Sequence, residues 1–460
     1  MLKKFLPAVF MAVALLMLAR LMAPRAGASP SIVTFIVNST ADVTDAAPGN
    51  GSCDTGGGVC TLRAAIQEAN AHPDADIIQL QPNMTYQLTQ IAQDGYITSG
   101  LIITSPVTIL GAGLNSTIID GNASALHARV FNITSTVIIS GVTIQHGFSS
   151  NMAGGIFNSG RLTIINSAIL SNTANGLNDW GGGIWNAGPM TLTNSLIRGN
   201  IAGSHNSYGG GLYNQSALMV IDSTISDNTI SGSPGEGGGL FTIGYTTTIM
   251  NSTISGNHAN VGGGIYRSGY PLFIINSTIS GNYSNGDGGG LYAAAGTTSL
   301  FNTTIADNQA NADNSGSGYG GGVYNGSGTL NFRNTLIADN EVVIHSIPYP
   351  TLDLDDCSGT ITSQGYNMVY TVPYYCTVNG SYTLASPLLG PLQNNGGRTS
   401  TQALLKGSPA IDAGESPACT DLLGAPITTD QRGVPRPTTG GCDIGAYEYR
   451  WLTYLPLVKK

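Results

Sequence analysis

The heptapeptide NSTISGN occurs twice in this chain, at residues 251–257 and again at residues 276–282. Five further segments share its frame, in which Asn or Asp comes first, isoleucine is fourth and asparagine is last. These segments are NSAILSN (166–172), NSLIRGN (194–200), DSTISDN (222–228), NTTIADN (302–308) and NTLIADN (334–340). Such repetition indicates a structure in which equivalent residues have equivalent surroundings.

A glycine-rich element alternates with this frame. It begins as GGIF at 154–157 and continues in runs from GGGIW at 181–185 to GGGVY at 320–324. Successive copies start 25 to 32 residues apart, a period typical of stacked solenoids. The segments between, such as LMVI and LFII, are short and rich in β-branched residues, without helical periodicity.

The repeat therefore predicts an all-β chain, a right-handed parallel β-helix of the pectin-lyase-like type with roughly nine or ten coils. Adjacent coils would pair as parallel strands about 4.8 Å apart. We expect the fourth-position isoleucines to form one continuous core and the terminal asparagines to form a ladder of side-chain amides in a turn conformation. The glycine run would supply a tight corner with positive φ.

Length variation is confined to one corner of the predicted coil. The segment from the last glycine to the next repeat frame is nearly constant, whereas the segment from the terminal asparagine to the next glycine run varies from 4 to 11 residues. Insertions from one face of a solenoid often form its binding face. This corner carries four candidate ligand-binding aromatics, which suit sugar or peptide contact, with ordinary loop packing as the alternative. They are Trp180, Tyr208, Tyr283 and Tyr319.

The composition narrows the possible partners. The chain has 460 residues, of which 9% are charged and 41% hydrophobic, with 63 glycines and a net charge of −9. The hydrophobic content disfavours disorder, and the absence of a basic stripe disfavours a nucleic-acid partner.

The N-terminus has the pattern of a cleaved signal peptide over residues 1–28. A basic MLKK start is followed by an apolar stretch at 5–19 and small residues at 26–28. Because the apolar stretch is short, a transmembrane helix in the mature chain is not expected. We therefore expect export, with the protein secreted or held at the cell surface.

The six cysteines suit an exported chain with disulfides, although six cysteines allow 15 pairings. Local spacing favours the pairs Cys53–Cys60, Cys357–Cys376 and Cys419–Cys442. A zinc site is disfavoured because the chain has no Cys/His cluster with ligand spacing.

The chain divides by composition into further segments after the signal peptide. An amphipathic helix at 60–70 suggests a cap over the open end of the β-helix. The expected segments are a capping module at 29–100, the repeats at 101–345, irregular disulfide-containing final coils at 346–392, a C-terminal module at 393–450 and an apolar, basic tail at 451–460.

The two ends of the chain carry a family resemblance. Residues 39–70, which include CTLRAA at 60–65, resemble the N-terminal CSLREA module of bacterial secreted β-helix proteins, although the motif itself differs. The segments GSPAIDAG, DQRGVPRP and CDIGAYE within 407–448 are similar to the choice-of-anchor Q module of such proteins. The repeats also resemble those of polymorphic outer-membrane adhesins. These resemblances imply a cell-surface or released β-helix protein.

Catalytic and metal-binding candidates come from acidic residues in the repeats. Glu236 and Asp287 each precede a glycine run two coils apart, hence about 9.5 Å, at the outer edge of the carboxylate spacing of inverting glycosidases. Asp227, Asp307 and Asp339 share one repeat position, where Ca²⁺ bridging competes with a role as solvated turn residues. No other cofactor is expected.

The favoured hypothesis is a non-catalytic extracellular or cell-surface protein that binds a glycan or another surface component through loops on one corner. The alternative is a polysaccharide lyase or glycoside hydrolase of the pectin-lyase-like fold, and a third is a structural spacer. The sequence leaves the oligomeric state, the anchoring mode and the ligand open.

Overall fold

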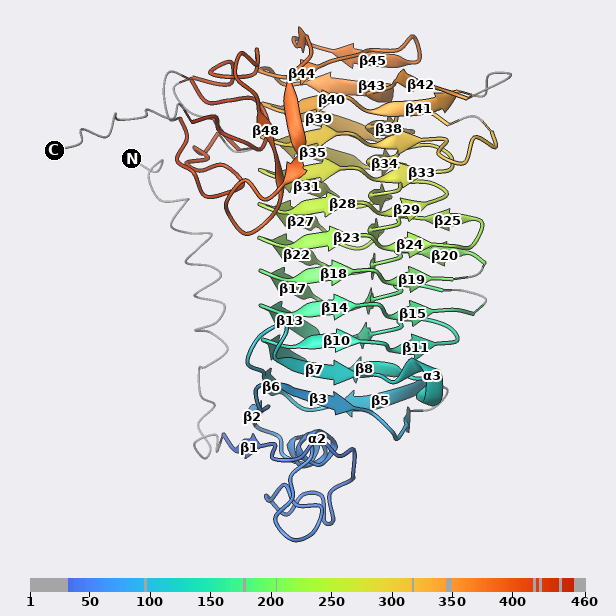
Figure 1. The fold of residues 1–460 in the computed structure, drawn as a ribbon, viewed down its shortest axis with the longest axis vertical. Helices are drawn as coiled ribbons and strands as arrows, with labels where there is room; N and C mark the ends of the chain where they lie inside the picture. Colours follow the sequence, from blue (N-terminus) through green and yellow to red (C-terminus); the bar gives the residue numbers. More distant parts are fainter. Residues whose placement is uncertain are drawn as a thin grey trace, which may run out of the picture.

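The computed structural model describes an all-β parallel β-helix of about ten turns, in agreement with the predicted fold class. In Figure 1 the coils stack along the long axis, with the N-terminal end at the bottom. The expected signal peptide (1–28) and C-terminal tail (451–460) lie outside the described residues. These are 32–94, 97–176, 179–203, 205–316, 318–344, 350–416, 419–421, 424–437 and 441–450.

The central part of the repeat frame forms a 12-stranded parallel sheet, here called the isoleucine sheet. Its strands are β3 (Met84–Gln87), β7 (Thr117–Asp120), β10 (Thr143–Gln145), β14 (Ala168–Leu170), β18 (Leu196–Arg198), β23 (Thr224–Ser226), β28 (Thr253–Ser255), β32 (Thr278–Ser280), β36 (Thr304–Ala306), β40 (Leu336–Ala338), β44 (Met368–Val369) and β46 (Thr383–Leu384).

One 23-stranded sheet covers two successive sides of each coil. The strands that follow directly on the glycine runs form the first side, here called the aromatic sheet. The next strands along the chain form the second side, here called the middle sheet. The aromatic sheet contains β4 (Ala92–Asp94), β5 (Ile97–Ile103), β8 (Arg129–Ile133), β12 (Ile156–Asn158), β16 (Ile184–Asn186), β21 (Leu212–Asn214), β26 (Leu240–Thr242), β30 (Ile265–Arg267), β34 (Leu291–Ala293) and β38 (Val323–Asn325). The middle sheet contains β1 (Thr34–Ile36), β2 (Asp76–Gln79), β6 (Val107–Leu110), β9 (Thr136–Ser140), β13 (Arg161–Ile165), β17 (Met190–Thr193), β22 (Leu218–Ile221), β27 (Thr247–Met250), β31 (Leu272–Ile275), β35 (Thr297–Phe301), β39 (Thr329–Arg333), β43 (Cys357–Ser363, shared with the aromatic sheet) and β45 (Cys376–Asn379).

A fourth set of short strands follows the terminal asparagines and forms a nine-stranded sheet. It contains β11 (Phe148–Ser149), β15 (Thr173–Ala174), β19 (Ile201–Ala202), β24 (Thr229–Ile230), β29 (His258–Ala259), β33 (Tyr283–Ser284), β37 (Gln309–Ala310), β41 (Glu341–Ile344) and β42 (Thr351–Leu354). Two small pairs complete the structure, β20 (Ser207–Tyr208) with β25 (Gly235–Glu236), and β47 (Leu389–Gln393) with β48 (Thr401–Leu404).

The isoleucine column is in register, as the repeat predicts. Ile225 pairs with Ile254 and Ile254 with Ile279 in parallel strands, and all three side chains are at most 1% exposed. Complete burial of each such side chain stabilises the fold by about 1.5–3 kcal/mol. One apolar core therefore runs along the axis of the coils.

The terminal asparagines form the expected ladder inside the coils. The side-chain amide and the backbone N–H of Asn228 both donate to Oδ1 of Asn257, at 2.9 and 3.0 Å, and equivalent bonds join the other rungs. The predicted turn conformation of the terminal asparagine was wrong. Positive φ occurs instead at the preceding residue, such as Asp227 (φ 54°), and at the first letter of the frame, such as Asn251 (φ 51°).

The glycine run makes the corner for two separate reasons. The first glycine of a run adopts positive φ, 74° at Gly237, which disfavours residues with a Cβ. The second glycine is required by close stacking, because a Cβ at Gly238 would lie 2.5 Å from the carbonyl oxygen of Gly263 in the next coil.

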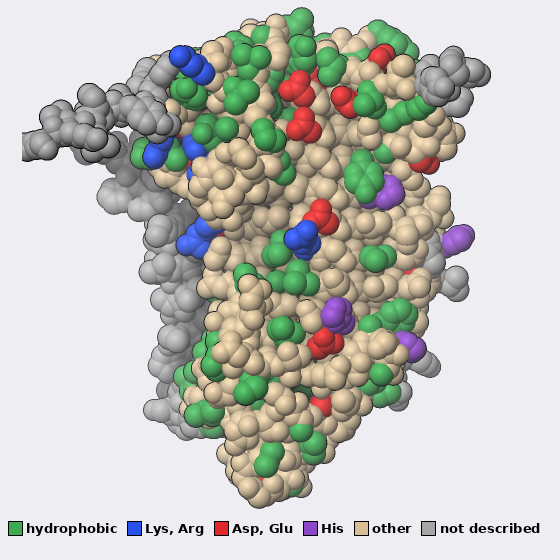
Figure 2. Space-filling model, in the orientation of Figure 1, with side chains coloured by type: hydrophobic (Ala, Val, Ile, Leu, Met, Phe, Trp, Pro, Cys, Tyr) green, Lys and Arg blue, Asp and Glu red, His purple; other side chains and the backbone are tan. Residues whose placement is uncertain are grey.

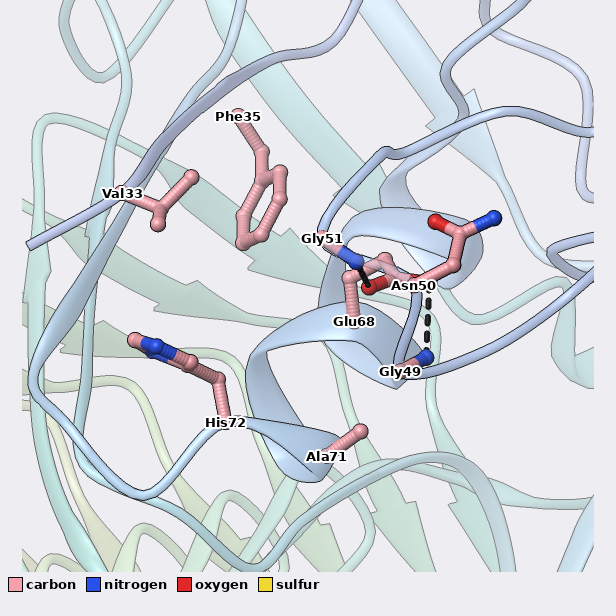
Figure 3. Close-up of a pocket in the computed structure, with 8 residues that line it drawn as sticks. All are labelled: Val33, Phe35, Gly49, Asn50, Gly51, Glu68, Ala71 and His72. Carbon is pink, nitrogen blue, oxygen red and sulfur yellow. Dashed lines mark hydrogen bonds between the residues drawn. The ribbon is translucent and has the colours of Figure 1, made fainter. Parts of the chain in front are cut away.

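Helix α2 (Leu62–Ala71) lies at the N-terminal end of the stack, and confirms the helix expected at 60–70. The Thr61 side chain caps it by accepting from the backbone of Ala64. Beside it is a cavity of about 250 Å³, in which Glu68 accepts from the backbones of Gly49 and Gly51 at 2.9 and 3.0 Å (Figure 3). The polar groups of this cavity thus hold the cap loop against α2. A short helix, α3 (Ala123–Leu126), follows β7.

The C-terminal segment, residues 399–448, lies against the side of the upper coils (Figure 1). Gln431 accepts from the hydroxyl of Thr278 at 2.6 Å and donates to that of Thr253 at 2.9 Å. The backbone of Ala446 donates to the hydroxyl of Thr304 at 3.0 Å. The outward side chains of Thr253, Thr278 and Thr304 on the isoleucine sheet are therefore buried. The sequence placed this module after the β-helix but gave no indication of this lateral contact.

The C-terminal segment has a buried charged centre. Arg436 pairs with Glu448 at 3.4 Å and Arg432 with Asp430 at 2.6 Å. Burial, together with the nearby charge of Glu448, raises the pKa of Asp443 to about 7. Three disulfides join the pairs that spacing favours, Cys53–Cys60, Cys357–Cys376 and Cys419–Cys442.

In the part of the chain that the structure describes, no helix is long and apolar enough to cross a membrane.

Candidate functional site

Five of the candidate residues lie in one vertical row at the glycine corner, here called the corner column. Each occupies the position before a glycine run, and parallel bridges or backbone hydrogen bonds join it to the next coil. The row consists of Trp180, Tyr208, Glu236, Val261, Asp287 and Tyr319. The structure thus brings together the two catalytic candidates and three of the four aromatic candidates.

Beside the corner column runs a row of outward aromatic side chains from the aromatic sheet, here called the aromatic ladder. It consists of Phe157, Trp185, Tyr213, Phe241, Tyr266, Tyr292 and Tyr324. In its upper part the rings lie parallel, with centroids 5.0 Å apart for Tyr266 and Tyr292 and 4.7 Å for Tyr292 and Tyr324. Because neighbouring rings cover each other's faces, the ladder offers ring edges and phenol groups for contact.

The ladder was not among the sequence candidates, although its signal is visible. The last residue of every glycine run is aromatic, from the Phe of GGIF to the Tyr of GGGVY. Successive side chains of a strand point to opposite faces. Because the residue before this aromatic one is buried, the aromatic side chain lies on the outer face of the strand.

Glu236 lies against the ladder at mid-height. Its carboxylate is hydrogen-bonded to the phenol of Tyr266 in the next coil, and burial raises the pKa of Glu236 above its ordinary value. Burial and the charge of Glu236 together raise the pKa of Tyr266. A carboxyl group in this setting ionises less readily than an exposed glutamate.

Asp287 occupies the same column position two coils further along, so the two carboxyl-bearing residues are about 9.6 Å apart along the axis. Its Oδ1 accepts from the backbone N–H of Tyr319 at 2.9 Å, and burial raises its pKa. Its charge contributes to the raised pKa values of Tyr292 and Tyr324.

A third carboxyl group, Asp355, was missed by sequence reasoning. It is fully buried in the coil after that of Tyr319, at the position of Gly321, where its Oδ2 accepts from the backbone of Gly320 at 2.7 Å and its Oδ1 has no hydrogen-bond partner. Burial raises its pKa to about 6, although hydrogen bonds from Gly320 and Tyr375 act in the opposite direction. The ring of Tyr375 lies 4.6 Å from that of Tyr319. Asp355 comes from the irregular final coils, where the repeat gives no register.

The aromatic members of the corner column fold back onto the ladder to different extents. The ring of Trp180 stacks on Tyr213 at 5.3 Å, and that of Tyr208 tilts against Phe241 at 4.8 Å. Tyr319 is 38% exposed, more than Trp180 or Tyr208, which are partly buried.

Tyr283 does not belong to this group. It lies in β33, on the short-strand sheet, and stacks on His258 of the preceding coil with centroids 4.5 Å apart. The residue is 39% exposed.

The three aspartates proposed for Ca²⁺ share the expected repeat position but not one site. Asp227 pairs with Arg198 at 2.8 Å and lies three coil steps from Asp307, roughly 14 Å. Asp307 accepts from Gln402 at 2.5 Å, and its pKa is raised by burial and by the charge of Asp339. Figure 2 shows acidic side chains gathered over the upper coils, around β40. Positive φ at all three positions gives a structural reason for Asp there.

Among the described residues, no group of three or more His, Cys, Asp or Glu side chains is placed to hold a metal ion.

The fold defines the class of protein as an all-β parallel β-solenoid. No family model matches the chain, and no curated protein matches it. Among solved structures, the pectate lyase Pel9A is similar at 14% identity with a TM-score of 0.46, over 92% of this chain and 98% of that one. ORF18 of Geobacillus virus E2 is similar at 13% identity with a TM-score of 0.25, over 69% and 63% of the two chains. Neither similarity identifies an activity.

Proposed function

We propose that this protein is a non-catalytic extracellular or cell-surface rod that binds a glycan along the corner column. The observation that carries the proposal is the register of Glu236, Asp287 and Tyr319 in one row beside the phenol edges of the aromatic ladder. Carboxylates and phenols can bond sugar hydroxyls, and the exposed ring of Tyr319 can stack on a sugar face.

The charge of the column supports binding over lyase chemistry. The described interactions that shift the pKa values of Glu236 and Asp287 include none with Lys, Arg or His. A lyase requires a base beside carboxylates that hold Ca²⁺, commonly Arg or Lys. Three disulfides favour an oxidising, extracellular setting.

Glycoside hydrolysis is the alternative, and the spacing of Glu236 and Asp287 favours it. Two coil steps, about 9.6 Å, lie at the outer limit for an inverting acid and base pair. Such a pair needs one carboxyl with a raised pKa and one that stays ionised. Burial raises both pKa values here, which argues against this division of roles.

The test is to incubate the purified protein with a panel of neutral, acidic and amino-sugar glycans while measuring binding and product release. We expect saturable binding without new reducing ends or unsaturated products, and weaker binding by Tyr319→Ala. Turnover that is lost in Glu236→Gln or Asp287→Asn would overturn the proposal in favour of hydrolysis. Absence of binding to every glycan would leave the spacer hypothesis.

A further inference from the structure

We propose that the corner column selects a cationic glycan, an extended 1,4-linked polymer whose sugars carry free amino groups. This inference rests on the proposed function and names the ligand class of the same site. It is carried by the charge of the column, the spacing of its carboxyl groups and the unpartnered oxygen of Asp355.

The upper half of the column has acidic groups without paired cations. Glu236 and Asp287 occupy the same column position two coil steps apart, about 9.6 Å, and Asp355 lies two coils beyond Asp287 at the position of the second glycine of a run. No Lys, Arg or His contributes to the pKa shifts of these groups or of the tyrosines beside them, among the described residues. A uronate or sulfated polymer would therefore meet only like charge here.

Among the described residues, the aromatic sheet carries Arg129 and Arg267, and both are removed from the column. Arg129 occupies the middle-glycine position four coil steps before Glu236, roughly 19 Å away. Arg267 is fully buried and donates to the backbone carbonyls of Gly269 and Tyr270 at 2.9 and 3.0 Å. Neither can neutralise the carboxyl groups of the upper column.

Asp355, beside the upper end of the column, has a carboxyl oxygen that the protein leaves without a partner. It is completely buried, yet its Oδ1 accepts no hydrogen bond from the protein, which is costly for a carboxyl oxygen. The charge of Asp287 raises its pKa, so the two carboxyl groups lie close enough to interact. An ammonium group bound at Asp287 would relieve this repulsion.

The repeat of the column suits a polymer better than a single cation. In an extended β-1,4-linked chain, alternate sugars present the same face at an interval similar to two coil steps. Amino groups on alternate sugars could then reach Glu236 and Asp287, while the sugars between them pass the phenols of Tyr266 and Tyr292. A charge-assisted contact of this kind is roughly twice as strong as a neutral one.

The test compares three oligosaccharides of equal length by calorimetry at mildly acidic pH: a glucosamine oligomer, its N-acetylated form and an oligogalacturonate. We expect the glucosamine oligomer to bind at least about tenfold more tightly than its acetylated form. The oligogalacturonate should not bind. Added salt should weaken the glucosamine complex, because the column is partly exposed.

Variants separate the column from general charge effects. Asp287→Asn should weaken glucosamine binding by about tenfold. The matched control is Asp222→Asn, which removes the same charge at a remote position where other coils carry Asn with positive φ. Its affinity should equal that of the parent protein. An equal loss in both variants would overturn the site.

The remaining outcomes distinguish this inference from the proposed function. Equal binding of the acetylated and free oligomers would overturn the ligand class and leave glycan binding intact. Failure of all three to bind, together with failure of the wider glycan panel, would overturn both. Displacement of the glucosamine oligomer by an oligolysine at equal charge concentration would show that the column selects charge alone, and would overturn a glycan ligand.

Discussion

Removal of one amide from the interior ladder should destabilise the coils far more than removal of an amide from the outer surface. The Asn257 side chain is fully buried and takes part in four hydrogen bonds. Its amide donates to Ile225 and Asn282 at 3.0 and 2.8 Å, and its carbonyl accepts twice from Asn228. Asn257→Ala therefore leaves two buried donors of Asn228 without their acceptor.

Each buried group left unpaired costs about 1–3 kcal/mol, so the two donors together cost about 2–6 kcal/mol. We expect Asn257→Ala to lower the free energy of unfolding by about 4 kcal/mol. The matched control is Asn194→Ala, which loses one exposed hydrogen bond to Asn166. It also places alanine at a residue whose backbone φ is 47°. Its cost should be about 1–2 kcal/mol.

Both variants should be measured by urea unfolding and by hydrogen exchange at the Asn228 amide. Exchange is included because stacked repeats can open locally without global unfolding. We expect faster exchange at this amide in Asn257→Ala and parental exchange in Asn194→Ala. If the two substitutions cost the same, the interior ladder does not stabilise the coils in the way that its hydrogen bonds indicate.

Three further predictions test the corner, the charged centre and the lateral contact. Gly289→Ala should cost at least about 3 kcal/mol in thermal unfolding, because its Cβ would lie 2.4 Å from a carbonyl oxygen. Gly281→Ala, with open space at φ 66°, should cost about 1–2 kcal/mol, and equal costs would contradict the stacking argument. The pKa of Asp443 is about 7 in the folded state and about 3.9 in the unfolded chain. The folded state therefore binds the additional proton between these values, and the free energy of unfolding should fall as pH rises from about 4 to about 7. Asp443→Asn should reduce this slope in pH-dependent unfolding, and an unchanged slope would exclude this carboxyl as its source. Gln431→Ala should raise proteolysis of residues 399–448 while the lower coils stay protected, whereas uniform protection would argue against Gln431 as the main contact.

The stacking of coils could be predicted from the sequence because identical letters recur wherever identical environments recur. The register of Ile225, Ile254 and Ile279 follows directly from NSTISGN and its variants. The corner column was also accessible, since its residues are defined by the glycine runs that follow them. The repeats were therefore sufficient to predict the fold and the corner column of the candidate site.

The rest depends on contacts between segments that do not repeat. Asp355 and Tyr375 join the corner through the irregular final coils, where no periodic pattern fixes which residues face outward. Gln431 reaches Thr278 across 153 residues of chain, and only the tertiary fold brings them together. The position of the turn conformation was missed for a different reason, because Asn tolerates positive φ wherever it stands in the frame.

The lateral contact also limits how this molecule can change its length. Thr253, Thr278 and Thr304 meet the C-terminal segment at fixed intervals, so inserting or deleting a coil among them would misalign every bond above the change. Coils nearer the N-terminus, such as the one that contains Ile197, have no such partner in the described residues and could be duplicated with their own neighbours as templates. Duplication of coils near the N-terminus would then give β-helices of different length, while the contact between the upper coils and the C-terminal segment stays unchanged.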